Sequence, residues 1–241
     1  MNADEQKKRL KDQLYNANII YYWEYQGAGQ KYTNLAYWIL SIFSGGIPLL
    51  FLWLVTDLTV DSPVFLGLFI LSTTLVFIGR YLFAPDKDYC YYLTPMGIHY
   101  TEQDMIPEMA YKIARGFAWV GIVVCIIVAF IFGPLAFVGA GAFALMSFGM
   151  TNFQSTVDKS YIFIDERSVV FNVMNDSVLS LSVPGKGGFE YVGDIYTPTL
   201  EKKAELLTHL ISLFPEMEVV KIKRLNDKYK HPIYQQDEVA E

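Results

Sequence analysis

The three histidines are the first residues to test for catalysis or metal binding, because imidazole serves as a general base and as a metal ligand. His99, His209 and His231 stand far apart in the sequence. None has a partner histidine, cysteine or carboxylate at metal-ligand spacing in a suitable setting. We interpret His99, in a β-prone stretch, as a sheet residue. The sequence therefore predicts no metal ion, no cofactor and no catalytic residue.

A glycine-rich stretch, Gly185-Lys186-Gly187-Gly188, is the nearest approach to a phosphate-binding loop. Such a loop needs a glycine five residues before the Gly-Lys pair and a hydroxyl residue after the lysine. Ser180 and Gly187 occupy those positions, so both requirements fail. The stretch is typical of a flexible strand connection. Because no serine-hydrolase elbow is present either, we predict that the protein is not an enzyme.

Two groups of basic residues could contact an anionic lipid headgroup or an acidic partner. One precedes the apolar part of the chain and the other lies near the C-terminus: Lys7, Lys8, Arg9 and Lys11, then Lys221, Lys223 and Arg224. In the second group lysines alternate with Val220 and Ile222, which is typical of a solvated strand edge, and we favour that interpretation. The partners considered are membrane lipids and a protein partner or a second copy of the chain.

Composition and charge exclude some classes of function. The formal net charge of −6 argues against a nucleic-acid-binding protein, which usually presents a basic face. Cys90 lies outside the apolar runs and Cys125 inside one, so we expect no disulfide. The first 34 residues are polar and lack the apolar core of a cleavable signal peptide.

The apolar residues, 53% of the chain, concentrate between Leu35 and Met150. A membrane-spanning helix needs about 20 largely apolar residues. Leu35–Val55 and Val64–Phe83 satisfy this, and Gly116–Met150 has no charge and is long enough for two helices broken at Gly133-Pro134. We therefore predict four transmembrane helices in two hairpins, with three spans or a re-entrant pair as alternatives.

The basic residues also predict an orientation. Lysine and arginine flank alternate ends of the four predicted spans, and the short connections between the paired spans carry none. Cytoplasmic loops are enriched in these residues. We therefore expect a multi-pass protein of the cell (inner) membrane with both termini in the cytoplasm.

Small residues predict where the spans approach one another. Ala136, Ala140 and Ala144 share one face of the predicted fourth span, a spacing typical of close helix packing within the chain or between copies. Hydroxyl residues such as Ser41 and Ser72 favour helix packing over a small polar site.

We divide the chain into six segments. Asp4–Tyr25 has apolar residues at helical spacing and predicts a helix that lies on the inner leaflet or packs on the soluble domain. The segments are an N-terminal cytoplasmic or interfacial helix (1–34), a first hairpin of spans (35–84), a cytoplasmic loop with a β-hairpin (85–113), a second hairpin of spans (114–152), a β-rich domain (153–225) and a flexible tail (226–241).

The β-hairpin in the loop, Tyr89–Thr94 and Ile98–Thr101, is unstable in isolation and should pair with later strands. The expected later elements are strands at 161–164, 169–173, 178–183 and 189–195, a helix at 200–213 and a last strand at 219–225. The predicted fold class is thus membrane α-helical with a β-rich α+β cytoplasmic domain that the third and fourth helices split.

The phrase Tyr92-Leu93-Thr94-Pro95-Met96-Gly97-Ile98 resembles the strand–turn–strand that opens pleckstrin-homology-like domains of small bacterial membrane proteins. The resemblance covers about a dozen residues and the order of spans and strands, while the strand after the helix departs from it. It implies a binding or scaffolding module without catalytic residues.

These features lead to a hypothesis of an oligomeric membrane scaffold, sensor or regulator whose cytoplasmic domain binds a protein or lipid. A gated channel or membrane-disrupting effector is the second hypothesis, because the fourth span is rich in glycine and alanine. A lipid-modifying membrane enzyme ranks last, because no nucleophile, base or metal set is evident.

Overall fold

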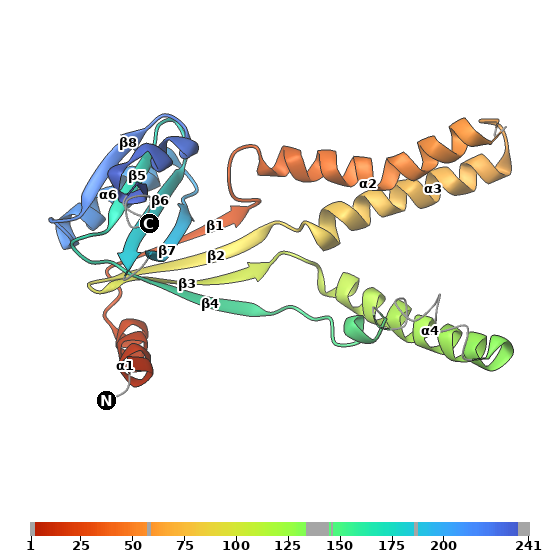
Figure 1. Cartoon of the computed structure of the whole chain (residues 1–241), viewed down its shortest axis with the longest axis horizontal. Helices are drawn as coiled ribbons and strands as arrows, with labels where there is room; N and C mark the ends of the chain where they lie inside the picture. The colour runs from red at the N-terminus through yellow and green to blue at the C-terminus, as the bar shows by residue number, and fades with distance from the viewer. Residues whose placement is uncertain (1–2, 57–58, 134–144, 146, 186–187, 236–241) are drawn as a thin grey trace. The chain divides into compact units, whose positions relative to one another are not determined.

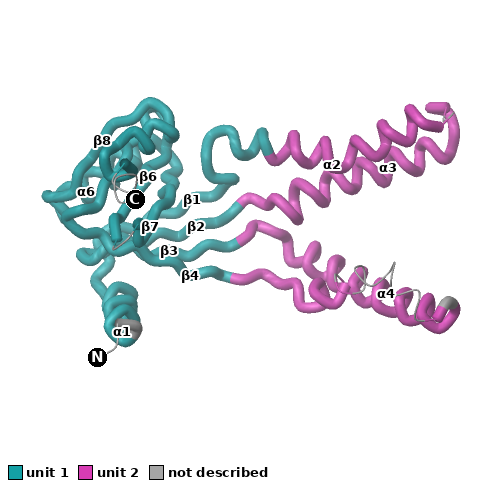
Figure 2. The backbone as a smooth tube through the Cα atoms, viewed as in Figure 1, with its two compact units in different colours: residues 1–36, 87–103, 157–241 teal, residues 37–86, 104–156 magenta. Residues whose placement is uncertain are grey.

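The chain forms two compact units in the computed structural model, which describes residues 3–56, 59–133, 145, 147–185 and 188–235. Unit 1 contains residues 1–36, 87–103 and 157–241, and unit 2 contains residues 37–86 and 104–156 (Figure 2). Each unit is therefore built from segments that are distant in the sequence.

The first sheet of unit 1 contains β1 (Tyr21–Gly27), β2 (Lys87–Thr94), β3 (Gly97–Asp104) and β4 (Val157–Phe163), in that spatial order (Figure 1). β1 pairs antiparallel with β2, and β3 pairs antiparallel with β4. The turn between β2 and β3 requires Gly97, whose φ is +142° and whose added Cβ would lie 2.1 Å from the Ile162 carbonyl oxygen. As expected, the hairpin shares a sheet with a later strand.

The second sheet of unit 1 has the order β7-β6-β5-β8. β5 (Val169–Val173), β6 (Val178–Gly185) and β7 (Gly188–Tyr196) are joined antiparallel, and β8 (Glu218–Ile222) runs parallel to β5. Helix α6 (Leu200–Leu213) supplies the connection that a parallel return needs. The Thr199 hydroxyl accepts a hydrogen bond from the Lys202 amide at 3.2 Å and so caps the start of α6.

One apolar core joins the two sheets and α6. Alternate residues of each strand face this core, which is why aromatic and branched side chains recur at every second position. The indole of Trp23 stacks on Tyr91 with ring centroids 4.9 Å apart and donates to the Tyr196 carbonyl at 2.9 Å. The fully buried members include Tyr91, Leu93, Ile98, Ile162, Leu179, Leu181, Ile195, Leu206 and Leu210.

A second apolar cluster lies around Phe171 and Ile222 in the second sheet. The chain after β8 forms two short 3-10 helices, η2 (Leu225–Lys230) and η3 (Pro232–Tyr234), which contribute to this cluster. The strand therefore ends at Ile222 instead of residue 225, and residues 226–235 are folded where a flexible tail was expected.

The N-terminal segment differs from the predicted single helix. Helix α1 (Ala3–Asn16) ends before the aromatic run, and Tyr21–Gly27 forms β1. Aromatic side chains fit a pleated, half-buried surface better than an exposed helix. On α1, Leu14 is fully buried and the Tyr15 hydroxyl donates to the Ser160 carbonyl at 3.3 Å, so the helix packs on the first sheet.

Unit 2 contains the apolar helices. They are α2 (Thr33–Val55), which begins within unit 1, α3 (Pro63–Ile78) with its π-helical extension η1 (Gly79–Phe83), and α4 (Glu108–Phe132). Among the described residues, these three helices are long and apolar enough to cross a membrane by length and composition. Arg80 in η1 is 2% exposed and pairs with Asp86 at 2.7 Å.

Small residues bring α2 and α3 together within unit 2. A Cβ added to Gly45 would lie 2.6 Å from Val76 Cγ2, and the Ser72 hydroxyl donates to the Gly45 carbonyl at 2.6 Å. A Cβ on Gly79 would lie 3.3 Å from Ser41 Oγ. The small and hydroxylated residues therefore serve helix packing, as the sequence favoured.

The predicted fold class of four transmembrane helices in two hairpins with a split cytoplasmic domain is wrong. The chain is α+β with two four-stranded sheets, and its described part holds three helices of spanning length. Helix α4 ends at Phe132, before a Gly133 whose φ is +72°, and residues 134–144 and 146 lie outside the described residues. Hydropathy locates apolar runs but does not show how the strands between them pair. The fold class depends on that pairing, so it could not be predicted from hydropathy.

Candidate functional site

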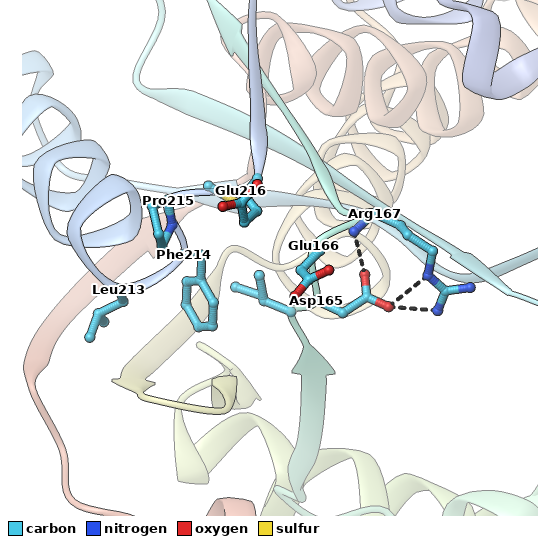
Figure 3. A pocket seen from close by; sticks show the side chains of 9 residues that line it. Asp165, Glu166, Arg167, Leu213, Phe214, Pro215 and Glu216 are labelled. Atoms are coloured by element: carbon cyan, nitrogen blue, oxygen red, sulfur yellow. Dashed lines mark hydrogen bonds and ion pairs between the residues drawn. The ribbon is translucent and has the colours of Figure 1, made fainter.

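A cavity of about 510 Å³ in unit 1 is the candidate site (Figure 3). Two connections form its walls: the turn from β4 to β5 and the segment from α6 to β8. Its lining combines an apolar floor with charged residues, namely Ile164, Asp165, Glu166, Arg167, Leu213, Phe214, Pro215, Glu216 and Met217.

The β4–β5 turn is held by its own hydrogen bonds. The Asp165 amide donates to the Ser168 hydroxyl at 3.0 Å, and the Ser168 hydroxyl donates to the Asp165 carboxylate at 3.1 Å. The Arg167 amide donates to the same carboxylate at 3.0 Å. Aspartate and serine form such turns readily because their side chains bond to nearby backbone amides. The turn therefore presents Glu166 and Arg167 from a fixed backbone.

The opposite wall follows the end of α6. The Phe214 amide donates to the Leu210 carbonyl at 2.8 Å, and the Met217 amide donates to the Phe214 carbonyl at 3.1 Å. Met217 is buried in the core, whereas Pro215 and Glu216 are exposed. The Glu218 amide then donates to the Ser168 carbonyl at 3.3 Å, which joins this wall to the β4–β5 turn.

Negative charge predominates around the cavity. Of its charged lining residues, Asp165, Glu166 and Glu216 are acidic and Arg167 is basic. Burial raises the pKa of Asp165, but the hydrogen bonds from Arg167 and Ser168 outweigh it and hold the pKa below its ordinary value. The guanidinium already contacts Asp165 at 2.6 Å, so Glu166 and Glu216 supply the uncompensated charge. A cavity lined by uncompensated carboxylates and apolar side chains favours binding of a partner segment that carries both basic and apolar residues.

The two predicted groups of basic residues lie beside different sheets of unit 1. Lys7, Lys8, Arg9 and Lys11 belong to α1, which packs on the first sheet, and Lys11 Nζ lies 5.1 Å from the Tyr161 ring centroid. Lys221 is in β8, and Lys223 and Arg224 follow it. Lys7 lines one cavity, with Tyr161 and Glu190, and Lys223 and Arg224 line another. The structure does not bring the groups together.

The remaining predicted residues lie apart from the candidate site. Ala136, Ala140 and Ala144 fall outside the described residues, as do Lys186 and Gly187. His99 stacks on Tyr92, His209 stacks on Tyr21, and His231 lies 3.3 Å from Glu218. Within the described ranges, no group of three or more histidine, cysteine, aspartate or glutamate residues is arranged to hold a metal ion.

Comparison with known proteins identifies the family. The TsiV2 immunity protein family model matches residues 1–241. The chain belongs to the TsiV2 immunity protein family. It is 35% identical over 230 residues to a protein named immunity protein TsiV2 from Vibrio cholerae serotype O1, and the match covers 95% of both chains. No solved structure matches.

Membership in the TsiV2 immunity protein family corrects several predictions. The resemblance of residues 92–98 to pleckstrin-homology-like domains is wrong, because the family match spans the whole chain and a strand–turn–strand occurs in many folds. The hypotheses of a scaffold, sensor or regulator, of a channel or membrane-disrupting effector, and of a lipid-modifying enzyme are also wrong. An immunity family points to a non-enzymatic role and to a protein partner.

The family match does not support the terms membrane, oligomer or lipid partner. Hydropathy measures how long an apolar segment is. The length of an apolar helix does not identify the function of the protein that contains it. Helices α2, α3 and α4 are thus candidates to cross a membrane by length and composition only.

Sequence analysis missed every residue of the candidate site. Asp165-Glu166-Arg167-Ser168 was interpreted only as the connection between two strands, and Phe214-Pro215-Glu216 fell between the expected helix at 200–213 and the expected strand at 219–225. The available signal was the charge of both connections and their exposed apolar residues, since binding residues concentrate in loops on rigid scaffolds.

Proposed function

We propose that this chain is an immunity protein that neutralises a toxin by binding it through the acidic cavity of unit 1. The observation that carries the proposal is the whole-chain match to the TsiV2 immunity family. An immunity protein acts by recognising a toxin, so its binding surface should be preformed and chemically distinctive. The cavity between the β4–β5 turn and the α6–β8 segment has both properties.

The chemistry of the cavity indicates the kind of segment it receives. Glu166 and Glu216 are exposed carboxylates on opposite walls, and Phe214 and Pro215 provide apolar contact area on the wall that carries Glu216. An aromatic anchor surrounded by charge is a common arrangement in tight protein interfaces. The net charge of −6 also favours association with a basic partner. We therefore expect a lysine- or arginine-containing loop or helix of the toxin to enter the cavity.

We also propose that the chain is a multi-pass protein of the cell membrane with its N- and C-termini in the cytoplasm. Helices α2, α3 and α4 support this localisation by their length and composition. Strands β1, before α2, and β4, after α4, belong to one sheet, which supports placing both ends of the chain on the same side. The lysines that precede α2 support the cytoplasmic side. A toxin that acts on or crosses the membrane would then meet its immunity protein there.

The test is protection of living cells. Toxin genes of the source organism would each be expressed in a sensitive host, with and without the full chain. We expect one toxin to kill the host alone and to spare it when the chain is present. If the chain protects against none of these toxins while accumulating at normal levels, the proposed function is wrong.

Charge reversal separates the cavity from the rest of the surface. The double variant Glu166→Lys with Glu216→Lys should lose protection, because it repels the basic segment that the cavity receives. Asp12→Lys with Asp158→Lys is the matched control, since both residues are exposed, lie away from the cavity lining and change the net charge equally. Equal protection by both variants would show that the toxin binds elsewhere.

A further inference from the structure

A second cavity of unit 1, about 630 Å³ in volume, is lined by three separate segments, two of which carry basic residues. Lys31 precedes α2, Lys223 and Arg224 follow β8, and Asn175 and Asp176 form the turn between β5 and β6. All of its lining residues belong to unit 1.

The topology explains why these segments meet. β5 and β8 are parallel and in register, with Val173 opposite Ile222, so both strands end at the same edge of the sheet. The Met174 amide donates to the Ile222 carbonyl at 2.8 Å and fixes the two exits side by side. Crevices outside the carboxyl ends of parallel strands are recurrent ligand sites.

The three cations of this cavity are only partly neutralised: the Asp227 carboxylate lies near Arg224 and accepts a hydrogen bond from its amide at 3.0 Å. Lys31, Lys223 and Arg224 are exposed, and none takes part in an ion pair with another described residue. Asp176 is the acidic residue in the lining, and its backbone carbonyl accepts a hydrogen bond from buried Lys203. Positive charge therefore exceeds negative charge in the cavity, unlike the acidic cavity proposed to bind the toxin.

The start of α2 gives the cavity its second feature. Lys31, Tyr32, Thr33 and Ala36 all line it, and Thr33 is the first residue of a helix of spanning length. Tyr32 is 70% exposed beside Lys31. A tyrosine and a lysine at the end of an apolar helix are typical of residues that lie at the level of lipid headgroups.

We propose that this cavity binds a phosphate group, held by Lys31, Lys223 and Arg224. Arginine and lysine bind phosphate through charge-assisted hydrogen bonds, and a planar guanidinium can contact two oxygens at once. The phosphate can come from an anionic lipid headgroup or from free phosphate. The lipid source rests on the proposed membrane localisation, whereas the site itself does not depend on toxin binding.

The experiment uses the purified full chain in an uncharged detergent. Dihexanoyl phosphatidylglycerol and inorganic phosphate would be titrated separately by calorimetry. Binding of the lipid alone would assign the site to a headgroup, and binding of inorganic phosphate with equal or greater affinity would assign it to free phosphate. If neither compound binds, the proposal is overturned.

Substitutions locate the binding. The triple variant Lys31→Gln, Lys223→Gln and Arg224→Gln should weaken binding at least about tenfold, because three cations near one phosphate are lost. Lys221→Gln is the control, since Lys221 is exposed in β8, just before Lys223 and Arg224, but does not line the cavity. Equal weakening in the control would show nonspecific charge attraction and overturn the site.

A single Lys31→Gln variant keeps the test valid if the triple variant misfolds, because Lys31 precedes α2 and lies outside the segment between β8 and η2 that carries the other two cations. It should weaken binding by a smaller factor than the triple variant, and binding equal to that of the unmodified chain would contradict a role for Lys31. Toxin protection provides an independent measurement: loss of phosphate binding with intact protection would support a separate site.

Discussion

Unit 1 buries its large apolar side chains, whereas unit 2 exposes them. Phe171 and Leu179 in unit 1 are fully buried, but Phe117 and Phe130 on α4 are 72% and 86% exposed. The two units therefore differ in how their apolar surface is kept from water. Unit 1 covers its apolar surface with its own second sheet and helix, while the apolar surface of the unit 2 helices requires cover from their surroundings.

The largest effect should follow removal of a buried ring in unit 1. Phe171→Ala is expected to destabilise unit 1 by roughly 3–5 kcal/mol, because it leaves a cavity in the cluster beside η2 and η3. Phe130→Ala is the comparison in unit 2 and should change stability by less than about 0.5 kcal/mol in detergent. Hydrogen exchange of the β5 and β6 amides measures the first effect. A similar small change in both variants would contradict the contrast between the units.

Helix packing in unit 2 gives the next largest effect. Gly45→Leu should destabilise the α2–α3 pair by roughly 1–3 kcal/mol, because its side chain meets Val76 and the Ser72 carbonyl. Gly46→Leu gains the same helix propensity but has nothing within 4 Å of its added Cβ. Thermal unfolding in detergent, followed by circular dichroism, compares the two variants. Equal melting temperatures would show that α2 and α3 do not pack through Gly45.

The smallest predicted effect is the pH dependence of unit 1. His99 is buried between Tyr15 of α1 and Tyr92 of β2, and burial lowers its pKa below the ordinary 6.5. The folded chain keeps this imidazole neutral where the unfolded chain is protonated. Stability is therefore present above pH 6.5 and is lost as the pH falls through the lowered pKa.

Replacement of His99 isolates its contribution from those of the carboxylates. Between pH 7.5 and 5.5, the melting temperature of the unmodified protein should fall by roughly 1–3 °C more than that of His99→Phe. On α1, the Lys11 Nζ lies 5.9 Å from the Tyr15 ring centroid, and the His99→Phe variant leaves this cation in place. An identical fall in both proteins would remove His99 as a contributor.

The local sequence pattern predicted several strands and helices correctly, but it did not predict how they are arranged. The strands at 169–173 and 178–183 and the helix at 200–213 follow from β-branched runs and 3.6-residue periodicity, and the structure contains β5, β6 and α6 there. The run Tyr21–Gly27 was misassigned because its aromatic residues fit both an interfacial helix and a strand, and only pairing with β2 decides between them.

The candidate site could not be predicted because it depends on contacts between distant residues. Asp165–Arg167 and Phe214–Glu216 are nearly fifty residues apart and meet because β8 returns parallel to β5. Likewise, Lys31 joins Lys223 and Arg224 only through the fold of unit 1. The sequence grouped Lys221 with Lys223, but Lys221 lies within β8, and only Lys223, which follows the end of the strand, lines the cavity.

The most direct test of the central claim is the affinity of the chain for the toxin identified by the protection experiment. The dissociation constant would be measured with the full chain in detergent and the purified toxin. We expect Glu166→Lys with Glu216→Lys to weaken binding at least about tenfold, or 1.4 kcal/mol, and Asp12→Lys with Asp158→Lys to leave it unchanged. An unchanged dissociation constant in the cavity variant would contradict toxin binding at the acidic cavity of unit 1.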